Sequence, residues 1–293
     1  PESHREPRAA ARRSPPGVHD AIQGVLAQII AQMSHWEPAS QLSRINAAAP
    51  GGWHGIAPEF VSVMIVALDI AARSDGAFDP AMGALVDLWG FGPPGPRADV
   101  PKESAIDAAR AAIGLGAIEL DPLLLRLRRV RPARLDLSAI AKGYAVDAVA
   151  ARLRAMGCTD FLVEIGGELV GAGIQPDGQP WWVDVEPPPG VALAPLRIAL
   201  HGIAVATSGD YRRFGAQGSH SIDPRTGRPI AHGTASVTVI HAECCHADAW
   251  ASALTVLEPE AAMALAERED LAVQLVVRGK GERLSGALRA MLD

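Results

Sequence analysis

The stretch FLVEIGGELVGAG, residues 161–173, decides the fold class. Its apolar residues alternate with other residues and are bounded by glycines, which is typical of short β-strands. The same pattern returns in WWVDVEPP (181–188), LRIALHGIAVATSG (196–209), SVTVIHAE (236–243) and LAVQLVVRG (271–279). Helices come first in the chain and then stand between clustered strands. This order favours an α+β architecture over a doubly wound sheet.

The remaining segments are predicted from their periodicity and their breakers. Apolar residues at helical spacing predict a helix over 20–33, with Asp20 as its cap, and a second one from Pro58 that Gly76 closes. Other helices are expected over 103–114, 143–157 and 247–269, the last broken at Pro259. Residues 120–137 are predicted to form a hairpin of two strands, and 90–101 a surface loop.

Composition excludes several classes of function. The 293 residues are 48% hydrophobic and 20% charged, with a net charge of −6, so the chain has a core but no basic field, and nucleic acid is not an expected partner. Three cysteines give no evident disulfide framework, and charges or turn residues interrupt every apolar run before membrane-spanning length. Residues 1–19, rich in Arg and Pro, are expected to be a disordered or cropped leader, and 20–293 one domain.

Polar residues gather in three islands, and the first indicates a metal. Asp248 and Ser252 are four apart on a predicted helix, so both side chains leave one face, where a carboxylate and a hydroxyl could share a hard cation. A helix-start Asp with an interhelical Ser explains the same spacing equally well. The neighbouring Cys244, Cys245 and His246 make a poor zinc site, since adjacent cysteines chelate badly together.

The second island lies at a strand-to-helix junction. Asp136 ends a strand, and Lys142 with Gly143 opens a helix, so backbone amides and a cation face one space where an anion could bind. A lone lysine in a first helical turn is more often simply solvated. Asp147 is expected to be a surface or helix-packing carboxylate.

The third island is the turn SHSIDPRTGRP, residues 219–229. His220 could act as a general base, although a loop histidine is more often only hydrogen-bonded. Arg225 could hold a phosphate through its fork of donors, while Pro224 and Gly227 fix the turn. Nearby, Thr207, Ser208 and Gly209 either line a cleft or form a simple turn.

Seven ordered islands together resemble a known family. They are MSHWEPASQLSRIN, GAFDPAMGALVDLWGFGP, LDLSAIAKGYAVD, VEIGGELVGAG, ATSGDYRRF, SHSIDPRTGRP and ADAWASALTVL, from about Ile22 to the C-terminus. In this order they resemble the ApbE-type flavin transferases, which are FAD:protein FMN transferases. The resemblance implies an α+β fold with a T-fold-like core, mixed or antiparallel sheets with packed helices, FAD in a cleft and Mg²⁺ at its pyrophosphate. FMN would pass from FAD to a Thr or Ser of an acceptor flavoprotein, with release of AMP.

The resemblance also implies roles for particular residues. The metal ligands would be the carbonyl of Ala139 and the side chains of Asp248 and Ser252, and His220 would be the base for the acceptor hydroxyl. The residues expected against FAD are Trp36, Ala77, Phe78, Asp79, Asp136, Lys142, Ser221 and Ile222.

This chain departs from the family pattern at several positions. Ser252 stands for the usual Thr, Trp36 for Tyr, Ala139 for a common Gly, and Ala81 and Ala84 for Thr and Pro. The opening strand of the family is not recognisable. Two alternatives therefore remain, an FAD pyrophosphatase that uses water as nucleophile and a non-catalytic flavin-binding protein. The resemblance places the protein in the periplasm or at the inner membrane, through an N-terminal anchor outside the given sequence.

Overall fold

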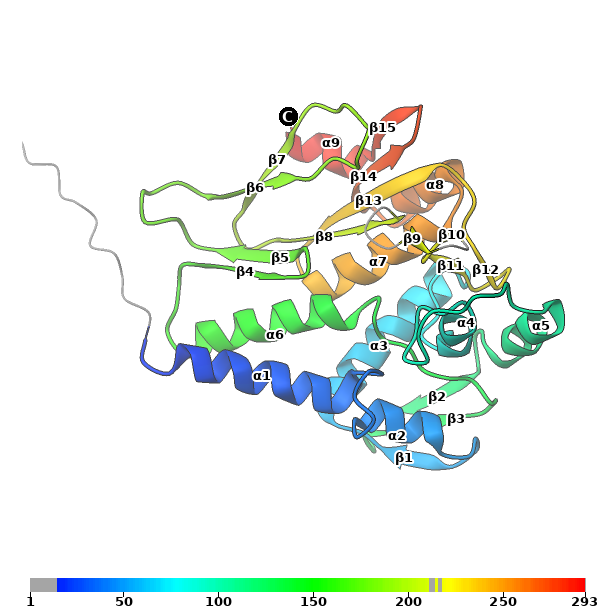
Figure 1. The fold of residues 1–293 in the computed structure, drawn as a ribbon. Helices are drawn as coiled ribbons and strands as arrows, with labels where there is room; N and C mark the ends of the chain where they lie inside the picture. The colour runs from blue at the N-terminus through cyan, green and yellow to red at the C-terminus, as the bar shows by residue number, and fades with distance from the viewer. Residues whose placement is uncertain (1–14, 211–213, 216–217, 293) are drawn as a thin grey trace, which may run out of the picture.

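A six-stranded sheet forms the centre of the protein. The computed structural model describes residues 15–210, 214–215 and 218–292. The strand order is β15–β14–β13–β8–β5–β4, and every neighbouring pair is antiparallel (Figure 1). This confirms the α+β prediction. The strands are β4 Phe161–Ile165, β5 Glu168–Ala172, β8 Ala204–Gly209, β13 Thr234–His241, β14 Ala272–Val277 and β15 Gly281–Leu284.

Helix α7 (Cys244–Val256) lies against one face of this sheet and carries the core. It contacts β8 and β13 on one side and helices α3 (Pro58–Arg73) and α6 (Ala141–Ala155) on others. Nearly all of its side chains are buried, with Trp250 at the centre of the largest apolar cluster. A helix that is enclosed all round needs apolar or small residues on every face, which the run of alanines in ADAWASAL supplies. Helix α8 (Pro259–Arg268) contacts α7 and β14, and α1 (Val18–Met33) packs on α6, farther from the sheet.

The opposite face of the sheet is covered by a hairpin and a short helix. Strands β6 (Trp181–Val185) and β7 (Leu196–Leu200) pair with each other, and α9 (Gly286–Leu292) lies near β14. Their inward side chains form a separate apolar cluster with Val205 and Ile240 of the sheet. Val205 and Ala206 of β8 therefore face different clusters, as the two-residue period of a strand requires.

A smaller part of the fold lies beside these layers. It contains a three-stranded antiparallel sheet in the order β1–β3–β2 and three short helices, with the SHSIDPRTGRP turn as two short strands of its own. The elements are α2 Gln41–Ala47, β1 Trp53–Gly55, α4 Gly83–Leu88, α5 Glu103–Ala112, β2 Ile118–Asp121, β3 Arg126–Arg129, β9 Phe214–Gly215, β10 Gly218–Ser219, β11 Ile222–Asp223 and β12 Arg228–Pro229.

The predicted helices are confirmed, and so is the hairpin over residues 118–129. Residues 130–137 form no strand, so the prediction that Asp136 ends one was wrong. Three further corrections concern the helices. Gly17, and not Asp20, is the N-cap of α1, without a side-chain cap bond. Helix α2 was not predicted, although Ser40 caps it by accepting a hydrogen bond from the Ser43 amide at 2.9 Å. Helix α4 was not predicted either. It is only six residues long, too short for periodicity to distinguish it from a turn.

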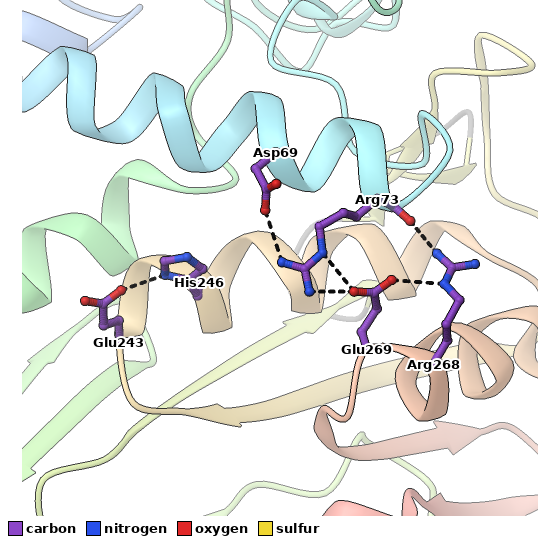
Figure 2. A network of polar contacts seen from close by, with 6 residues as sticks. All are labelled: Asp69, Arg73, Glu243, His246, Arg268 and Glu269. Atoms are coloured by element: carbon purple, nitrogen blue, oxygen red, sulfur yellow. Dashed lines mark hydrogen bonds and ion pairs between the residues drawn. The ribbon is translucent and has the colours of Figure 1, made fainter. Parts of the chain in front are cut away.

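An ion-pair network ties the C-terminal ends of α3 and α8 together. Arg73 donates to Glu269 at 2.5 and 2.8 Å and to Asp69 at 3.1 Å (Figure 2). Its guanidinium also lies over the Trp250 ring, at 5.2 Å from the ring centroid. Arg268 donates to Glu269 and to the Arg73 carbonyl. Exposed pairs contribute little singly, so the network chiefly joins the ends of α3 and α8.

Of the predicted leader, residues 1–19, the first 14 lie outside the described residues, and α1 already begins at Val18. In the part of the chain that the structure describes, no helix has the length and apolar character needed to cross a membrane.

Candidate active site

The site begins where the N-terminus of α6 meets α7. Gly143 permits this approach, because a Cβ there would lie 2.3 Å from the Cys244 carbonyl oxygen and 2.8 Å from the Asp248 Cβ. The Gly143 amide donates to Asp248 Oδ2 at 2.9 Å. This amide is one of those at a helix start that lack an intrahelical acceptor. A carboxylate of α7 therefore satisfies it and lies in the favourable field of the α6 N-terminus.

Two buried carboxylates share one ammonium group at this junction. Asp248 and Glu168 are each 2% exposed. Lys142 Nζ donates to Glu168 Oε1 and lies 3.8 Å from Asp248 Oδ1. Burial raises the pKa of Asp248, and Lys142 and the Gly143 amide do not fully offset it. Burial and the Asp248 charge raise the pKa of Glu168 to about 7.

The charge of Lys142 is maintained by the same pair. Burial acts to lower the pKa of Lys142, but Asp248 and Glu168 outweigh it, so the pKa lies above its ordinary value. Lys142 is therefore ion-paired as well as partly solvated, because its side chain is 45% exposed. An ammonium ion and the first amides of α6 lie together, as expected for an anion site.

Ser252 lies one turn along α7 from Asp248 and is half-buried. Its hydroxyl hydrogen-bonds Ser208 Oγ of β8 at 3.1 Å, whereas Thr207 points to the other side and bonds Thr238. Ala139 lies in the turn that leads into α6, where the Ala141 amide donates to the Leu137 carbonyl.

These groups fit a small hard cation. Lys142 Nζ lies 3.8 Å from Asp248 Oδ1, which is beyond hydrogen-bonding distance. The hydroxyl oxygens of Ser252 and Ser208 are further oxygen ligands of the kind that such a cation takes. Among the described residues, no three His, Cys, Asp or Glu side chains form a group able to hold a metal ion. A cation here would therefore depend on a single carboxylate, that of Asp248, together with the Ser252 hydroxyl and the Ala139 carbonyl. These are the three ligands that the family resemblance implies.

A second polar site lies at the other end of the segment that carries Lys142. Asp136 Oδ1 accepts from the Ser138 amide at 2.8 Å and lies 3.0 Å from His35 Nδ1. Burial alone would lower the pKa of His35. The Asp136 carboxylate raises this pKa by more than burial lowers it, so the pKa lies above its ordinary value. A cavity of about 90 Å³ opens beside the pair. Its lining includes His35, Ser43, Asn46, Gly83, Asp87, Arg134 and Asp136.

Close backbone contacts bring three sequence islands to this cavity. Asn46 exchanges two side-chain hydrogen bonds with the Leu135 backbone, at 2.7 and 2.9 Å. The Asp136 amide donates to the Pro80 carbonyl at 2.9 Å. A Cβ at Gly83 would lie 2.9 Å from the carbonyl oxygens of Arg134 and Leu135, so only glycine fits there.

The GAFD segment is held inside the fold. Ala77, Phe78 and Asp79 are buried, and both Asp79 oxygens accept backbone amides at 2.7 Å, from Ala81 and Gly114. Burial raises the pKa of Asp79 despite these bonds. In this structure Asp79 organises the loop before α4.

The SHSIDPRTGRP turn is fixed by its own side chains and lies beside the loop after α4. Arg225 directs its fork at Asp223, with contacts of 2.9 and 2.8 Å, so the guanidinium shapes the turn. His220 lies edge-on to Phe91, with ring centroids 6.3 Å apart. Ser221 donates its amide to Ser219 Oγ, and Ile222 is buried in the core.

The other predicted residues have clear places. Trp36 is 57% exposed, beside the His35 ring, and its face is available for stacking. Asp147 is the helix-packing carboxylate that was predicted, since it accepts the amides of Cys244 and Cys245 at the start of α7. Burial raises the pKa of both thiols, which disfavours the thiolates that zinc needs.

Sequence reasoning named neither Glu168 nor His35 as site residues. Both stand inside quoted islands, VEIGGELVGAG and MSHWEPASQLSRIN. Their partners, Lys142 and Asp136, are 26 and 101 residues away along the chain, so only folding reveals the pairing.

Comparison with known proteins identifies the family of this chain. The ApbE family model matches residues 5–276. The FAD:protein FMN transferase of Vibrio cholerae serotype O1 is 36% identical over 274 residues, covering 90% of this chain and 82% of the relative. That of Escherichia coli K12 is 35% identical over 254 residues, covering 84% and 72%.

Solved structures show the same likeness in three dimensions. The flavinyl transferase ApbE of Pseudomonas stutzeri superposes with a TM-score of 0.86 at 38% identity, over 98% of this chain and 90% of that one. The flavin transferase ApbE of Vibrio cholerae gives 0.87 at 34% identity, over 98% and 93%. A family match across most of the sequence, with relatives above one third identity, means that this chain belongs to the ApbE family.

Proposed function

We propose that this chain is an Mg²⁺-dependent FAD:protein FMN transferase. It would attach FMN through a phosphoester to a Thr or Ser hydroxyl of an acceptor flavoprotein and release AMP. The observation that carries the proposal is the junction of α6 and α7. There a buried carboxylate suited to a cation lies next to an ammonium ion and helix-start amides suited to phosphate.

The residues would divide the work of phosphoryl transfer between them. Asp248, Ser252 and the Ala139 carbonyl would hold Mg²⁺, which when bound neutralises charge on the pyrophosphate. Lys142 and the first amides of α6 would orient the phosphate oxygens. In this type of reaction, positioning and charge neutralisation supply most of the rate.

His220 would take the proton of the acceptor hydroxyl. The hydroxyl oxygen then bonds to the FMN phosphorus, the bond to the AMP oxygen breaks, and AMP leaves. His220 is placed beside Phe91 on a turn that the Arg225 fork holds rigid, which suits a base that must meet an incoming side chain.

The remainder of FAD would extend from Lys142 towards Asp136 and Trp36. The segment 136–142 joins the two polar sites directly, so one elongated ligand could contact both. The exposed Trp36 ring offers a stacking surface for an aromatic ring of FAD. The predicted contacts at Ala77, Phe78, Asp79, Ser221 and Ile222 stay predictions of the family match.

The acceptor and the compartment are part of the same proposal. A transferase of this kind needs a flavoprotein whose Thr or Ser is accessible to His220. We propose a periplasmic or inner-membrane-associated location, as the family resemblance implies.

Transfer can be separated from its alternatives in one assay. FAD, Mg²⁺ and an acceptor flavoprotein are incubated with the chain, and flavin fluorescence of the acceptor is read in a denaturing gel. Fluorescent acceptor supports transfer. Free FMN without labelled acceptor supports the FAD pyrophosphatase, and intact FAD after hours with Mg²⁺ supports a non-catalytic flavin-binding protein.

Two variants test the assigned roles. His220→Ala should abolish transfer and leave FAD binding intact, because the base acts only on the acceptor. Asp248→Asn should remove Mg²⁺ binding together with turnover. Full transfer by the first variant, or unchanged Mg²⁺ dependence in the second, would contradict these assignments.

A further inference from the structure

Glu168 is the one member of the junction with no role in the proposed function. It is the first residue of β5 and follows Gly166 and Gly167, whose φ angles of +70° and +104° lie in the left-handed region. This turn directs the Glu168 side chain at Lys142. The island VEIGGELVGAG therefore supplies a charged side chain to the site, which its strand pattern alone did not indicate.

The contacts of Glu168 leave its carboxylate incompletely satisfied. Oε1 accepts from Lys142 Nζ, whereas Oε2 is buried and has no hydrogen-bond partner among the described residues. The turn lies against the pair, since a Cβ at Gly166 would lie 3.4 Å from Oε2 and 3.6 Å from the Lys142 Cδ. Burying a second carboxylate so close to Asp248 is costly, and such arrangements are typical of functional sites.

The charges explain what the second carboxylate could do. Lys142 Nζ contacts Glu168 directly but stays 3.8 Å from Asp248 Oδ1. Asp248 Oδ2 is already engaged by the Gly143 amide, so Oδ1 is the oxygen left for a cation. Without Glu168, Asp248 would be the carboxylate remaining beside Lys142, and the ammonium would move onto Oδ1.

We propose that Glu168 is a positioning residue, which holds Lys142 away from Asp248 Oδ1 and so keeps that oxygen available to Mg²⁺. The inference rests on the proposed function, because it assumes a metal at Asp248. Outer residues that orient metal ligands typically change metal affinity by about 10–100-fold when they are replaced.

The test measures Mg²⁺ binding directly, by calorimetry on the FAD-free chain. Glu168→Gln should weaken binding at least roughly tenfold, whereas Glu168→Asp, which keeps the charge, should recover most of the loss. Glu269→Gln is the matched control. It removes another largely buried carboxylate that pairs with a cation, at the far end of α8, and should leave Mg²⁺ affinity unchanged.

A double variant shows whether Glu168 acts through Lys142. In a Lys142→Met background no ammonium competes for Asp248, so adding Glu168→Gln should change Mg²⁺ affinity less than roughly threefold. The tenfold loss should therefore depend on Lys142. Equal losses in both backgrounds would overturn the positioning role. Thermal unfolding of each variant identifies any that fails to fold. If Glu168→Gln fails to fold, Lys142→Met alone tests the inference: without the competing ammonium it should bind Mg²⁺ at least as tightly as the wild type, and weaker binding would overturn the positioning role.

The outcomes separate this inference from the function on which it rests. If the wild-type chain binds Mg²⁺ and the Glu168→Gln variant binds it equally well, the inference is overturned and the proposed function is not. A wild-type chain that binds no Mg²⁺ overturns the metal assignment and the inference with it. FMN transfer to an acceptor, measured separately, tests the activity itself.

Discussion

Replacing Gly143 by alanine tests the packing that creates the site. The new Cβ would meet the Cys244 carbonyl oxygen at 2.3 Å and its carbon at 2.7 Å, and both are backbone atoms that cannot rotate away. An ordinary contact needs about 3.4 Å or more, so α6 and α7 must separate by roughly 1 Å. The same separation stretches the 2.9 Å bond from the Gly143 amide to Asp248.

The expected free energy follows from three contributions. Overpacking costs about 1–3 kcal/mol, and weakening a hydrogen bond to a buried charge costs about 1.5–3 kcal/mol. Removing a helical glycine returns about 0.5–1 kcal/mol. Gly143→Ala should therefore lower the free energy of unfolding by about 2–5 kcal/mol, a large share of a typical total of about 5–15 kcal/mol.

Urea denaturation of the FAD-free chain measures this change, with Gly24→Ala as the matched control. Gly24 lies in the middle of α1, and a Cβ there would meet nothing within 4 Å. The control should gain about 0.5–1 kcal/mol, the ordinary benefit of alanine in a helix. If the two variants change stability in the same direction, the close approach of α6 to α7 is not what Gly143 provides.

Two further predictions concern His35 and the Arg225 turn. The pKa of His35 is raised by Asp136, so its contribution to stability is complete below pH 6.5 and is lost as the pH rises through the higher folded value. His35→Gln should therefore cost less stability in urea titrations at about pH 9 than at about pH 6, and an equal cost at both would contradict the ion pair. Arg225 is 41% exposed and already paired with Asp223, so Arg225→Gln should cost less than about 1 kcal/mol. It should lower kcat by loosening the His220 turn without changing the FAD dissociation constant. Weakened FAD binding would make Arg225 a phosphate ligand instead.

Much of the fold could be predicted because its signals are local. Alternation in FLVEIGGELVGAG and the later segments predicted the strands, and helical spacing predicted α1, α3, α6 and α7. The errors occur where the local signals are weak. A six-residue helix such as α4 has too few turns for periodicity, and the cap of α2 depends on one serine hydroxyl. Strand β1 has three residues and exists only because β3 pairs with it.

By itself, the sequence determined the α+β class, the positions of the polar islands and the family to which they belong. The spacing of Asp248 and Ser252 already indicated one helical face. Which charges meet was decided only by the tertiary structure. Glu168 and Lys142 come from different elements, and their contact depends on a left-handed glycine turn and on a helix crossing that Gly143 alone permits. Electrostatic effects fall with distance in space and not with distance along the chain, so the shared ammonium and the raised pKa values of the carboxylates arise only in the folded protein.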